Sequence, residues 1–264
     1  KRGDTVAIFS ISNHVDMKEI AAGVDTLRAW GLNVRFADNL FKPNGRYDGT
    51  LRERVEATQE LLDDPSVKAM ISTRGGYGAF QTVPFLDFSK MKPSPKWVVG
   101  YSDVTAFHIA LSNAGIESIH GTMTNDLDDP ESGSTLREAL FGSPRNIVIP
   151  TNADCRVGEA CGRLVGGNLS LIYDAQGTPG SLDTDGAILL IEDVGEANYR
   201  IDKMLRNLKR SGKLDGIKGL VIGYMTNMAN DGKLDISIPE IVEEVLDGRD
   251  IPVMWGAPVG HEDP

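Results

Sequence analysis

The segment Gly100-Tyr101-Ser102-Asp103 has the residue types and the setting of an activated serine. It lies between the apolar run 97–99 and a helical pattern that starts at Val104. A serine on a sharp turn from strand to helix has its hydroxyl exposed at the helix N-terminus, as a nucleophile requires. The N–H of Asp103 would then point toward a developing oxyanion. Ser102 would also suit an N-cap, and the segment lacks the second glycine of Gly-x-Ser-x-Gly, so both interpretations stay open.

A serine nucleophile needs a base and a group that orients that base. His261 follows the loop 256–260 and is the favoured base, because it comes from the same half of the chain as Glu192. Glu192 follows an expected buried strand at 187–191, and a carboxylate in such a place is partly desolvated and needs a partner. His120, near another expected strand end, is the rival base.

The remaining histidines and acids near these segments have structural interpretations. We expect His14 to be exposed and His108 to point away from Ser102, because it lies six residues further along the helix. Asp193 and Glu196 are expected to favour the positive end of a helix that begins near residue 198.

The loop Arg74-Gly75-Gly76-Tyr77-Gly78 follows another expected strand. Its glycines permit close approach of the backbone to a ligand, and one of its N–H groups is a candidate second oxyanion donor. A phosphate loop is disfavoured because no Gly-Lys-Ser/Thr follows, and on its own the loop would be interpreted as a tight turn. Arg200 is a candidate for binding a substrate carboxylate, although the basic face of its helix is typical of a solvated surface.

These segments must be positioned by alternating strands and helices. Expected strands at 5–9, 33–36, 67–71 and 97–99 alternate with helices at 16–30 and 51–62, which predicts a parallel α/β sheet. In such sheets ligands lie beyond the carboxyl ends of the strands, where the glycine loop and Ser102 belong. The polar stretch 126–154 is expected to join two domains. In the second half we expect a β region at 161–165, a turn at 166–168, strands at 187–191, 220–223 and 252–255, and helices at 199–210 and 238–246.

Composition and charge indicate a globular protein and argue against several kinds of partner. The 264 residues are 41% hydrophobic and 25% charged, as in globular proteins, and the net charge of −11 argues against nucleic acid as a partner. No apolar stretch approaches the roughly 20 residues of a membrane span. No signal peptide is visible, although the chain opens at Lys1, so removal of a leader stays open. Cys155 and Cys161 lack metal-site spacing and are expected to be free thiols, with a local disulfide as the second interpretation.

Seven segments together resemble the LD-carboxypeptidase family of serine peptidases, and they occur in the family's order. They are Arg74-Gly-Gly-Tyr-Gly78, Gly100-Tyr-Ser-Asp103, Ile119-His-Gly-Thr-Met123, Gly166-Gly-Asn-Leu-Ser170, Ile191-Glu-Asp-Val-Gly-Glu196, Tyr199-Arg-Ile-Asp-Lys-Met-Leu205 and Gly260-His-Glu262. The resemblance implies an N-terminal α/β domain similar to the class I glutamine amidotransferase fold, at 1–145. It also implies a C-terminal swivelling β/α domain, at 156–264.

The resemblance further implies a catalytic triad of Ser102, Glu192 and His261, with no metal and no cofactor. The implied oxyanion hole consists of the backbone N–H groups of Gly76 and Asp103. Candidate substrate contacts are Gly75, Tyr77, Asn168 and Arg200.

The implied reaction is release of terminal D-alanine from muropeptide tetrapeptides during cell-wall recycling. The small peptide is the expected partner, with neither nucleic acid nor a membrane, in a cytoplasmic homodimer. The chain departs from the family pattern by stopping at Pro264 and by having Thr122 where proline is expected. Two alternatives remain: hydrolysis of a peptidyl-nucleotide antibiotic, as in relatives of microcin C self-immunity type, and peptide binding without cleavage.

Overall fold

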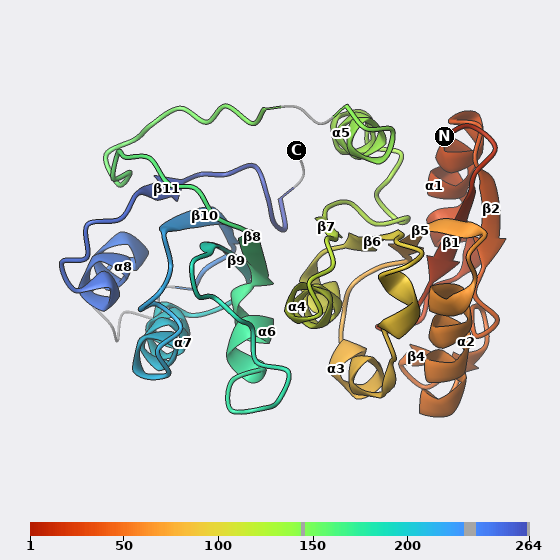
Figure 1. Ribbon diagram of the computed structural model, residues 1–264, viewed down its shortest axis with the longest axis horizontal. Coiled ribbons are helices and arrows are strands. Elements are labelled where there is room, and N and C mark those ends of the chain that lie inside the picture. Colours follow the sequence, from red (N-terminus) through yellow and green to blue (C-terminus); the bar gives the residue numbers. More distant parts are fainter. Residues whose placement is uncertain (144–145, 230–235, 263–264) are drawn as a thin grey trace. The chain divides into compact units, whose positions relative to one another are not determined.

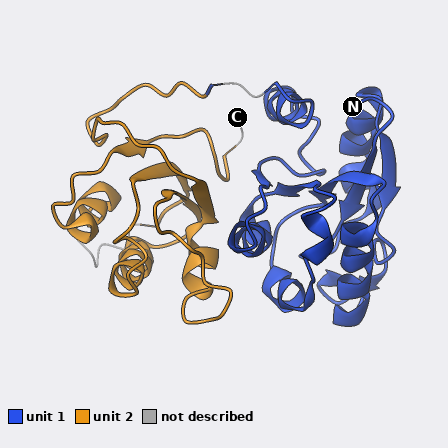
Figure 2. Cartoon of the chain, in the orientation of Figure 1, with its two compact units in different colours: residues 1–146 blue, residues 147–264 orange. Residues whose placement is uncertain are grey.

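The computed structural model describes residues 1–143, 146–229 and 236–262 (Figure 1). The chain divides into two compact units, residues 1–146 and 147–264 (Figure 2). The expected domain bounds at residues 145 and 264 lie outside the described residues. Each unit is built on its own parallel sheet, as the alternation of strands and helices predicts.

Unit 1 contains a five-stranded parallel sheet with the order β2-β1-β5-β6-β7. Its strands are β1 (Thr5–Phe9), β2 (Asn33–Phe36), β5 (Val67–Ser72), β6 (Trp97–Gly100) and β7 (Ile119–His120). The expected strands at 5–9, 33–36, 67–71 and 97–99 are confirmed. All pairings are parallel, so the loops that follow β1, β5 and β6 meet at one edge of the sheet.

Helices cover both faces of this sheet. In Figure 1, α1 (Met17–Ala29) and α5 (Pro130–Leu140) lie on one face, and α2 (Leu51–Asp63), α3 (Ala79–Thr82) and α4 (Thr105–Asn113) lie on the other. Two-residue strands β3 (Pro43–Asn44) and β4 (Tyr47–Asp48) form an antiparallel hairpin. Short 3₁₀ helices occupy Val83–Phe85 (η1), Ser89–Met91 (η2) and Ser102–Val104 (η3). α2 begins at a capping box, in which Thr50 and Glu53 each bind the other's backbone N–H.

Unit 2 contains a four-stranded parallel sheet with the order β11-β10-β9-β8. Its strands are β8 (Leu164–Asn168), β9 (Ile188–Val194), β10 (Gly219–Thr226) and β11 (Val253–Trp255). Its helices are α6 (Leu169–Asp174), α7 (Asn198–Arg210) and α8 (Ile238–Leu246), which lie on one face of the sheet in Figure 1. The apolar stripe of α7 is buried, as its helical spacing predicts: Ile201, Met204, Leu205 and Leu208.

Two expectations about local structure are wrong. The expected turn at 166–168 is the end of β8, where a Cβ on Gly166 would lie 1.9 Å from the Leu190 carbonyl oxygen. Gly166 therefore lets the backbones of β8 and β9 approach closely, which strand patterns do not reveal. Glu192 lies inside β9 rather than after it. The division between the two units falls within the polar stretch 126–154, as expected, and this stretch also contains helix α5, whose first turn is capped by Asp129.

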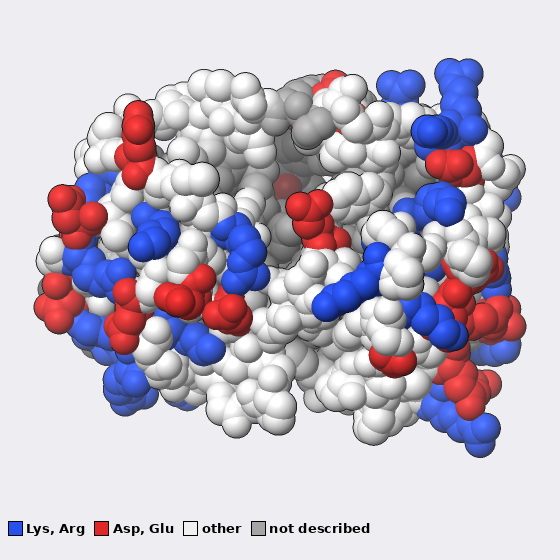
Figure 3. All heavy atoms as spheres, viewed as in Figure 1, with Lys and Arg blue, Asp and Glu red and all other residues white. Residues whose placement is uncertain are grey.

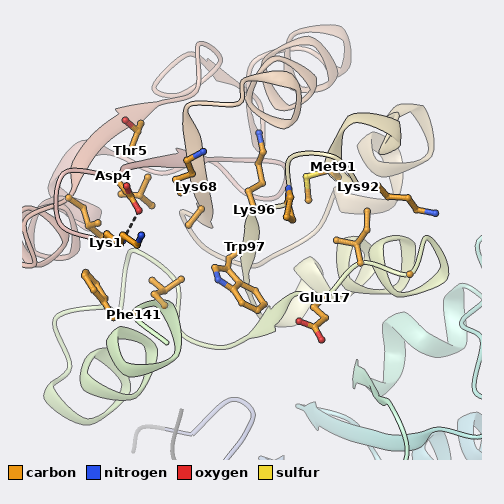
Figure 4. Close-up of a pocket in the computed structure, with 17 residues that line it drawn as sticks. Lys1, Asp4, Thr5, Lys68, Met91, Lys92, Lys96, Trp97, Glu117 and Phe141 are labelled. Atoms are coloured by element: carbon orange, nitrogen blue, oxygen red, sulfur yellow. Dashed lines mark hydrogen bonds and ion pairs between the residues drawn. The ribbon is translucent and has the colours of Figure 1, made fainter. Parts of the chain in front are cut away.

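A cavity of about 550 Å³ opens at the edge of the unit 1 sheet opposite to the loops after β5 and β6 (Figure 4). Thr5, Lys68 and Trp97, at the starts of three strands, line it. The backbone amino group of Lys1 donates a hydrogen bond to the Asp4 carboxylate there at 2.6 Å. The Lys96 ammonium donates to the backbone carbonyls of Leu61 and Asp64. None of the candidate catalytic residues lines this cavity.

Surface charge is mixed. On the face that Figure 3 shows, acidic and basic side chains are interspersed over both units. Oppositely charged side chains also form ion pairs, such as Arg206 with Glu244 at 2.6 Å. Among the helices of the described residues, none has the length and apolar composition needed to span a bilayer.

Candidate active site

Ser102 lies on a tight turn immediately after β6. Its φ of 61° is in the left-handed region, which L-residues other than glycine seldom adopt. Such strain costs about 1–3 kcal/mol and is concentrated at functional sites. Tyr101 and Val104, not Ser102, occupy the N-cap positions of η3 and α4. The N-cap interpretation of Ser102 is therefore wrong, and the turn has the geometry that exposes a nucleophile.

The glycine loop packs directly against this serine. A Cβ on Gly75 would lie 2.8 Å from the Ser102 Cβ and 2.9 Å from its Oγ, so only glycine fits there. A Cβ on Gly76 would collide with the Asn13 amide, whose Oδ1 accepts a hydrogen bond from the Tyr77 N–H at 3.3 Å. The structure thus places the loop 75–77 beside the serine turn, with Asn13 supporting it from the loop after β1.

Unit 2 contributes a carboxylate–imidazole pair. Glu192, fully buried on β9, accepts a hydrogen bond at Oε2 from His261 Nδ1 at 2.8 Å. An ionised carboxylate only accepts, so Nδ1 is the donor in this bond, and in the tautomer with its proton on Nδ1 the basic atom of the ring is Nε2. The His261 side chain is 17% exposed, which leaves the ring accessible to a reacting group.

Two glycines make room for this pair. A Cβ on Gly223, in β10, would lie 2.3 Å from the Val259 carbonyl oxygen and 3.2 Å from the Glu192 Cβ. Gly260 has φ of 133°, and a Cβ there would lie 3.0 Å from Glu192 Oε2. The Tyr224 N–H donates to the Val259 carbonyl at 2.8 Å, which fixes the loop before His261 against β10.

The other histidines have structural partners. His108 is buried; it bonds the Gly100 carbonyl through Nε2 and the Ser118 hydroxyl through Nδ1, both at 2.8 Å, and burial lowers its pKa to about 4. Its ring lies 5.7 Å from that of His120. His14 is half-buried rather than exposed, and its hydrogen bond with buried Asp48 raises its pKa. The structure places the favoured base, His261, against the Glu192 carboxylate.

Asp193 has a different role from the one expected. Its carboxylate accepts hydrogen bonds from the Asn168 side chain at 3.1 Å and from the Ser170 N–H and hydroxyl at 2.9 and 2.8 Å. It therefore anchors the start of α6 rather than that of α7. Sequence reasoning missed this network, because only the strand pairing places Asn168 beside β9.

The candidate substrate contacts differ in their surroundings. Asn168 caps α6 by accepting a bond from the Leu171 N–H at 3.3 Å. The Arg200 side chain is 54% exposed and pairs with Glu196 at 2.5 Å. Tyr77 is 54% exposed, beside Gly76. Cys155 and Cys161 are free thiols, as expected, and within the described ranges no group of three or more His, Cys, Asp or Glu side chains could hold a metal ion.

Unit 1 presents a strained serine turn, and unit 2 presents a buried carboxylate–imidazole pair. These are the residue types that serine hydrolases use for catalysis. Comparison of the sequence with known protein families identifies the family. Residues 6–121 match the LD-carboxypeptidase N-terminal domain, and residues 161–264 match the LD-carboxypeptidase C-terminal domain. The chain belongs to the LD-carboxypeptidase family, which confirms the resemblance and identifies the class of activity as that of a peptidase.

Three similar proteins show the range of this likeness. A probable murein peptide carboxypeptidase from Bacillus subtilis is 32% identical, over 100% of this chain and 85% of its own length. The crystal structure of a muramoyltetrapeptide carboxypeptidase from Oxalobacter formigenes is 30% identical, with a TM-score of 0.87 over 98% of this chain and 89% of its own. The microcin C7 self-immunity protein from Escherichia coli is 26% identical, over 99% of this chain and 87% of its length.

Proposed function

We propose that the protein is a serine-type LD-carboxypeptidase that releases terminal D-alanine from muropeptide tetrapeptides. The observation that carries the proposal is the 2.8 Å bond between His261 Nδ1 and Glu192, because it leaves Nε2 as a base. The strained turn at Ser102 supplies the matching nucleophile. Relatives named as murein peptide and muramoyltetrapeptide carboxypeptidases support the substrate class.

In the proposed mechanism, His261 Nε2 takes the proton of Ser102 while Oγ attacks the carbonyl carbon of the scissile bond. Glu192 holds the imidazole in position and stabilises its positive charge. The N–H groups of Gly76 and Asp103 donate to the oxyanion of the tetrahedral intermediate. His261 then gives its proton to the departing amine of D-alanine, and an acyl-enzyme remains.

Water completes the cycle. His261 removes a proton from the water molecule as it attacks the acyl carbon. As the bond between that carbon and Ser102 Oγ breaks, His261 returns the proton to Oγ, and the shortened peptide leaves with a new carboxylate. Gly75, Tyr77, Asn168 and Arg200 are the proposed substrate contacts. The half-exposed guanidinium of Arg200 suits the terminal carboxylate that defines a carboxypeptidase substrate, since Arg binds carboxylates through two parallel hydrogen bonds. We also expect a cytoplasmic homodimer.

The test is D-alanine release from a muropeptide tetrapeptide, compared with a pentapeptide ending in D-Ala-D-Ala. Ser102→Ala removes the nucleophile, and we expect kcat to fall by about 10⁶, as in other serine hydrolases that lose this group. Ser94→Ala is the matched control, because Ser94 lies just before β6 whereas Ser102 lies just after it. Release from the tetrapeptide alone, lost only in Ser102→Ala, supports the proposal; no release by the wild type rejects it.

A peptidyl-nucleotide substrate is the second candidate, because the similarity to the microcin C7 self-immunity protein covers 99% of this chain. The same assay separates the two candidates when an aminoacyl-nucleotide amide replaces the tetrapeptide. Cleavage of that amide with no D-alanine release would favour the second candidate. Binding of the tetrapeptide that is unchanged by Ser102→Ala, with no cleavage of either compound, would indicate a peptide-binding protein.

A further inference from the structure

The carboxylate of Asp103 connects three loops at the edge of the unit 1 sheet. Asp103 is 2% exposed and follows Ser102 directly. Its Oδ2 accepts a hydrogen bond from the Ser12 hydroxyl at 2.6 Å and another from the Ala79 N–H at 2.9 Å. Ser12 belongs to the loop after β1, and Ala79 is the first residue of α3 after the glycine loop.

These two bonds fix the far end of the glycine loop relative to the serine. At the near end, Gly75 is in contact with Ser102. In the middle, Asn13 bonds the Tyr77 N–H, and Asn13 adjoins Ser12, which Asp103 holds. Displacement of Ala79 would therefore move the loop N–H groups relative to Ser102 through a segment of only four residues.

Burial and the two hydrogen bonds have opposite effects on the charge of the Asp103 carboxylate. Burial raises the pKa of Asp103, while the bonds from Ser12 and Ala79 favour the ionised form. Loss of the side chain would leave the Ala79 N–H and the Ser12 hydroxyl without this acceptor. A buried donor without an acceptor is unfavourable, so we expect both segments to move until their donors find other acceptors. An asparagine keeps an acceptor oxygen at the same place, so Asn is the conservative variant.

We propose that the Asp103 side chain is a positioning residue that fixes the glycine loop against Ser102 and thereby sets the spacing of the two oxyanion donors. The inference rests on the proposed function for the assignment of those donors. Asp103 acts in two ways: its N–H donates to the oxyanion, and its carboxylate fixes the loop that supplies the other N–H. Misplacement of a catalytic group by about 1 Å can reduce a rate about 100-fold.

The experiment compares Asp103→Ala, Asp103→Asn and Ser12→Ala with the wild type in two assays. The first measures kcat and KM for D-alanine release. The second measures the rate at which a fluorophosphonate labels Ser102, which needs the nucleophile and the oxyanion hole but no peptide. We expect Asp103→Ala to lower kcat and the labelling rate by roughly 10–100-fold with KM changed less than about threefold. Asp103→Asn should recover most of both rates, and Ser12→Ala should give an intermediate loss.

Two controls separate positioning from loss of fold. Val24→Ala, in α1, removes buried apolar volume from unit 1 and leaves the hydrogen bonds of Asp103, Ser12 and Ala79 in place, so it should lower thermal stability while leaving kcat unchanged. Peptide affinity, measured in the Ser102→Ala background with and without Asp103→Ala, should be equal. Wild-type labelling rates in Asp103→Ala, or equal losses in Asp103→Asn and Asp103→Ala, would overturn the inference. Labelling that follows the expected order without any D-alanine release would overturn the proposed substrate and leave the inference supported.

Discussion

Replacement of Glu192 by glutamine tests the central pair of the proposed mechanism. Glutamine has nearly the same shape, so the change removes the negative charge beside His261 without altering the packing. The bond to His261 Nδ1 is 2.8 Å long, which puts the two charge centres about 4 Å apart when the imidazole is protonated. At an effective dielectric constant of about 20 that separation corresponds to about 4 kcal/mol of attraction, or about 10³ in kcat.

The glutamine amide adds a second effect. If its NH₂ group faces Nδ1, it stabilises the tautomer that carries the proton on Nε2, which cannot accept the serine proton. Both effects act on the chemical step, so we expect kcat to fall by about 10³ or more while KM changes little.

Steady-state D-alanine release from the tetrapeptide measures this loss, and thermal unfolding verifies that the variant folds. Glu244→Gln is the matched control, because this exposed acid pairs with Arg206 on the surface of the same unit and should leave kcat unchanged. A Glu192→Gln variant that folds and keeps kcat within tenfold of the wild type would refute the assignment of Glu192 as the group that orients His261.

Three further predictions concern packing and pH. Gly75→Ala should lower kcat at least about 100-fold, because its Cβ would lie 2.8 Å from the Ser102 Cβ; normal release rates would contradict the placement of the glycine loop. Gly223→Ala should lower kcat and thermal stability together, because the new Cβ would lie 2.3 Å from the Val259 carbonyl oxygen, and crystallography of the variant would show the His261 loop displaced. Burial lowers the pKa of His108 to about 4 from its ordinary 6.5, so its neutral form contributes stability that is complete above pH 6.5 and is lost as pH falls toward 4. Denaturant titrations should therefore show the wild type losing up to about 3 kcal/mol more free energy of unfolding than His108→Gln between pH 6.5 and pH 4. An equal dependence of the free energy of unfolding on pH in the two proteins would contradict the burial of a neutral ring.

The sequence was sufficient to predict the elements that carry the candidate site. Short β-branched runs such as 97–99 followed by turn residues indicate buried strands, and their order along the chain predicts a parallel sheet. From there, chemistry limits the choice. With four histidines in the chain, a base from the same half as Glu192 could be selected, and the structure places His261 against Glu192.

Contacts between distant segments could not be predicted in the same way. Ser12 and Asp103 are separated by 91 positions, and nothing in either local pattern indicates that they share a hydrogen bond. Asp193 is another case, because a carboxylate near a helix start suggests capping of the next helix, α7. The parallel pairing of β8 with β9 instead brings α6 to it. Register and burial decide both contacts, and they arise only when the sheets assemble.

The glycines explain why the site motifs are recognisable in sequence at all. Gly75, Gly223 and Gly260 each lie where a methyl group would strike a candidate catalytic residue or the loop that holds it. Larger residues at these positions would displace the glycine loop from Ser102, or Glu192 from His261, and a displacement of about 1 Å is enough to reduce a rate about 100-fold. The site thus depends on backbone segments that approach to van der Waals contact, and that requirement restricts residue type as strongly as the chemistry does. A glycine-rich motif beside a serine or a histidine is therefore evidence of close packing first, and of catalysis only where the packed side chain is a nucleophile, a base or the group that orients it.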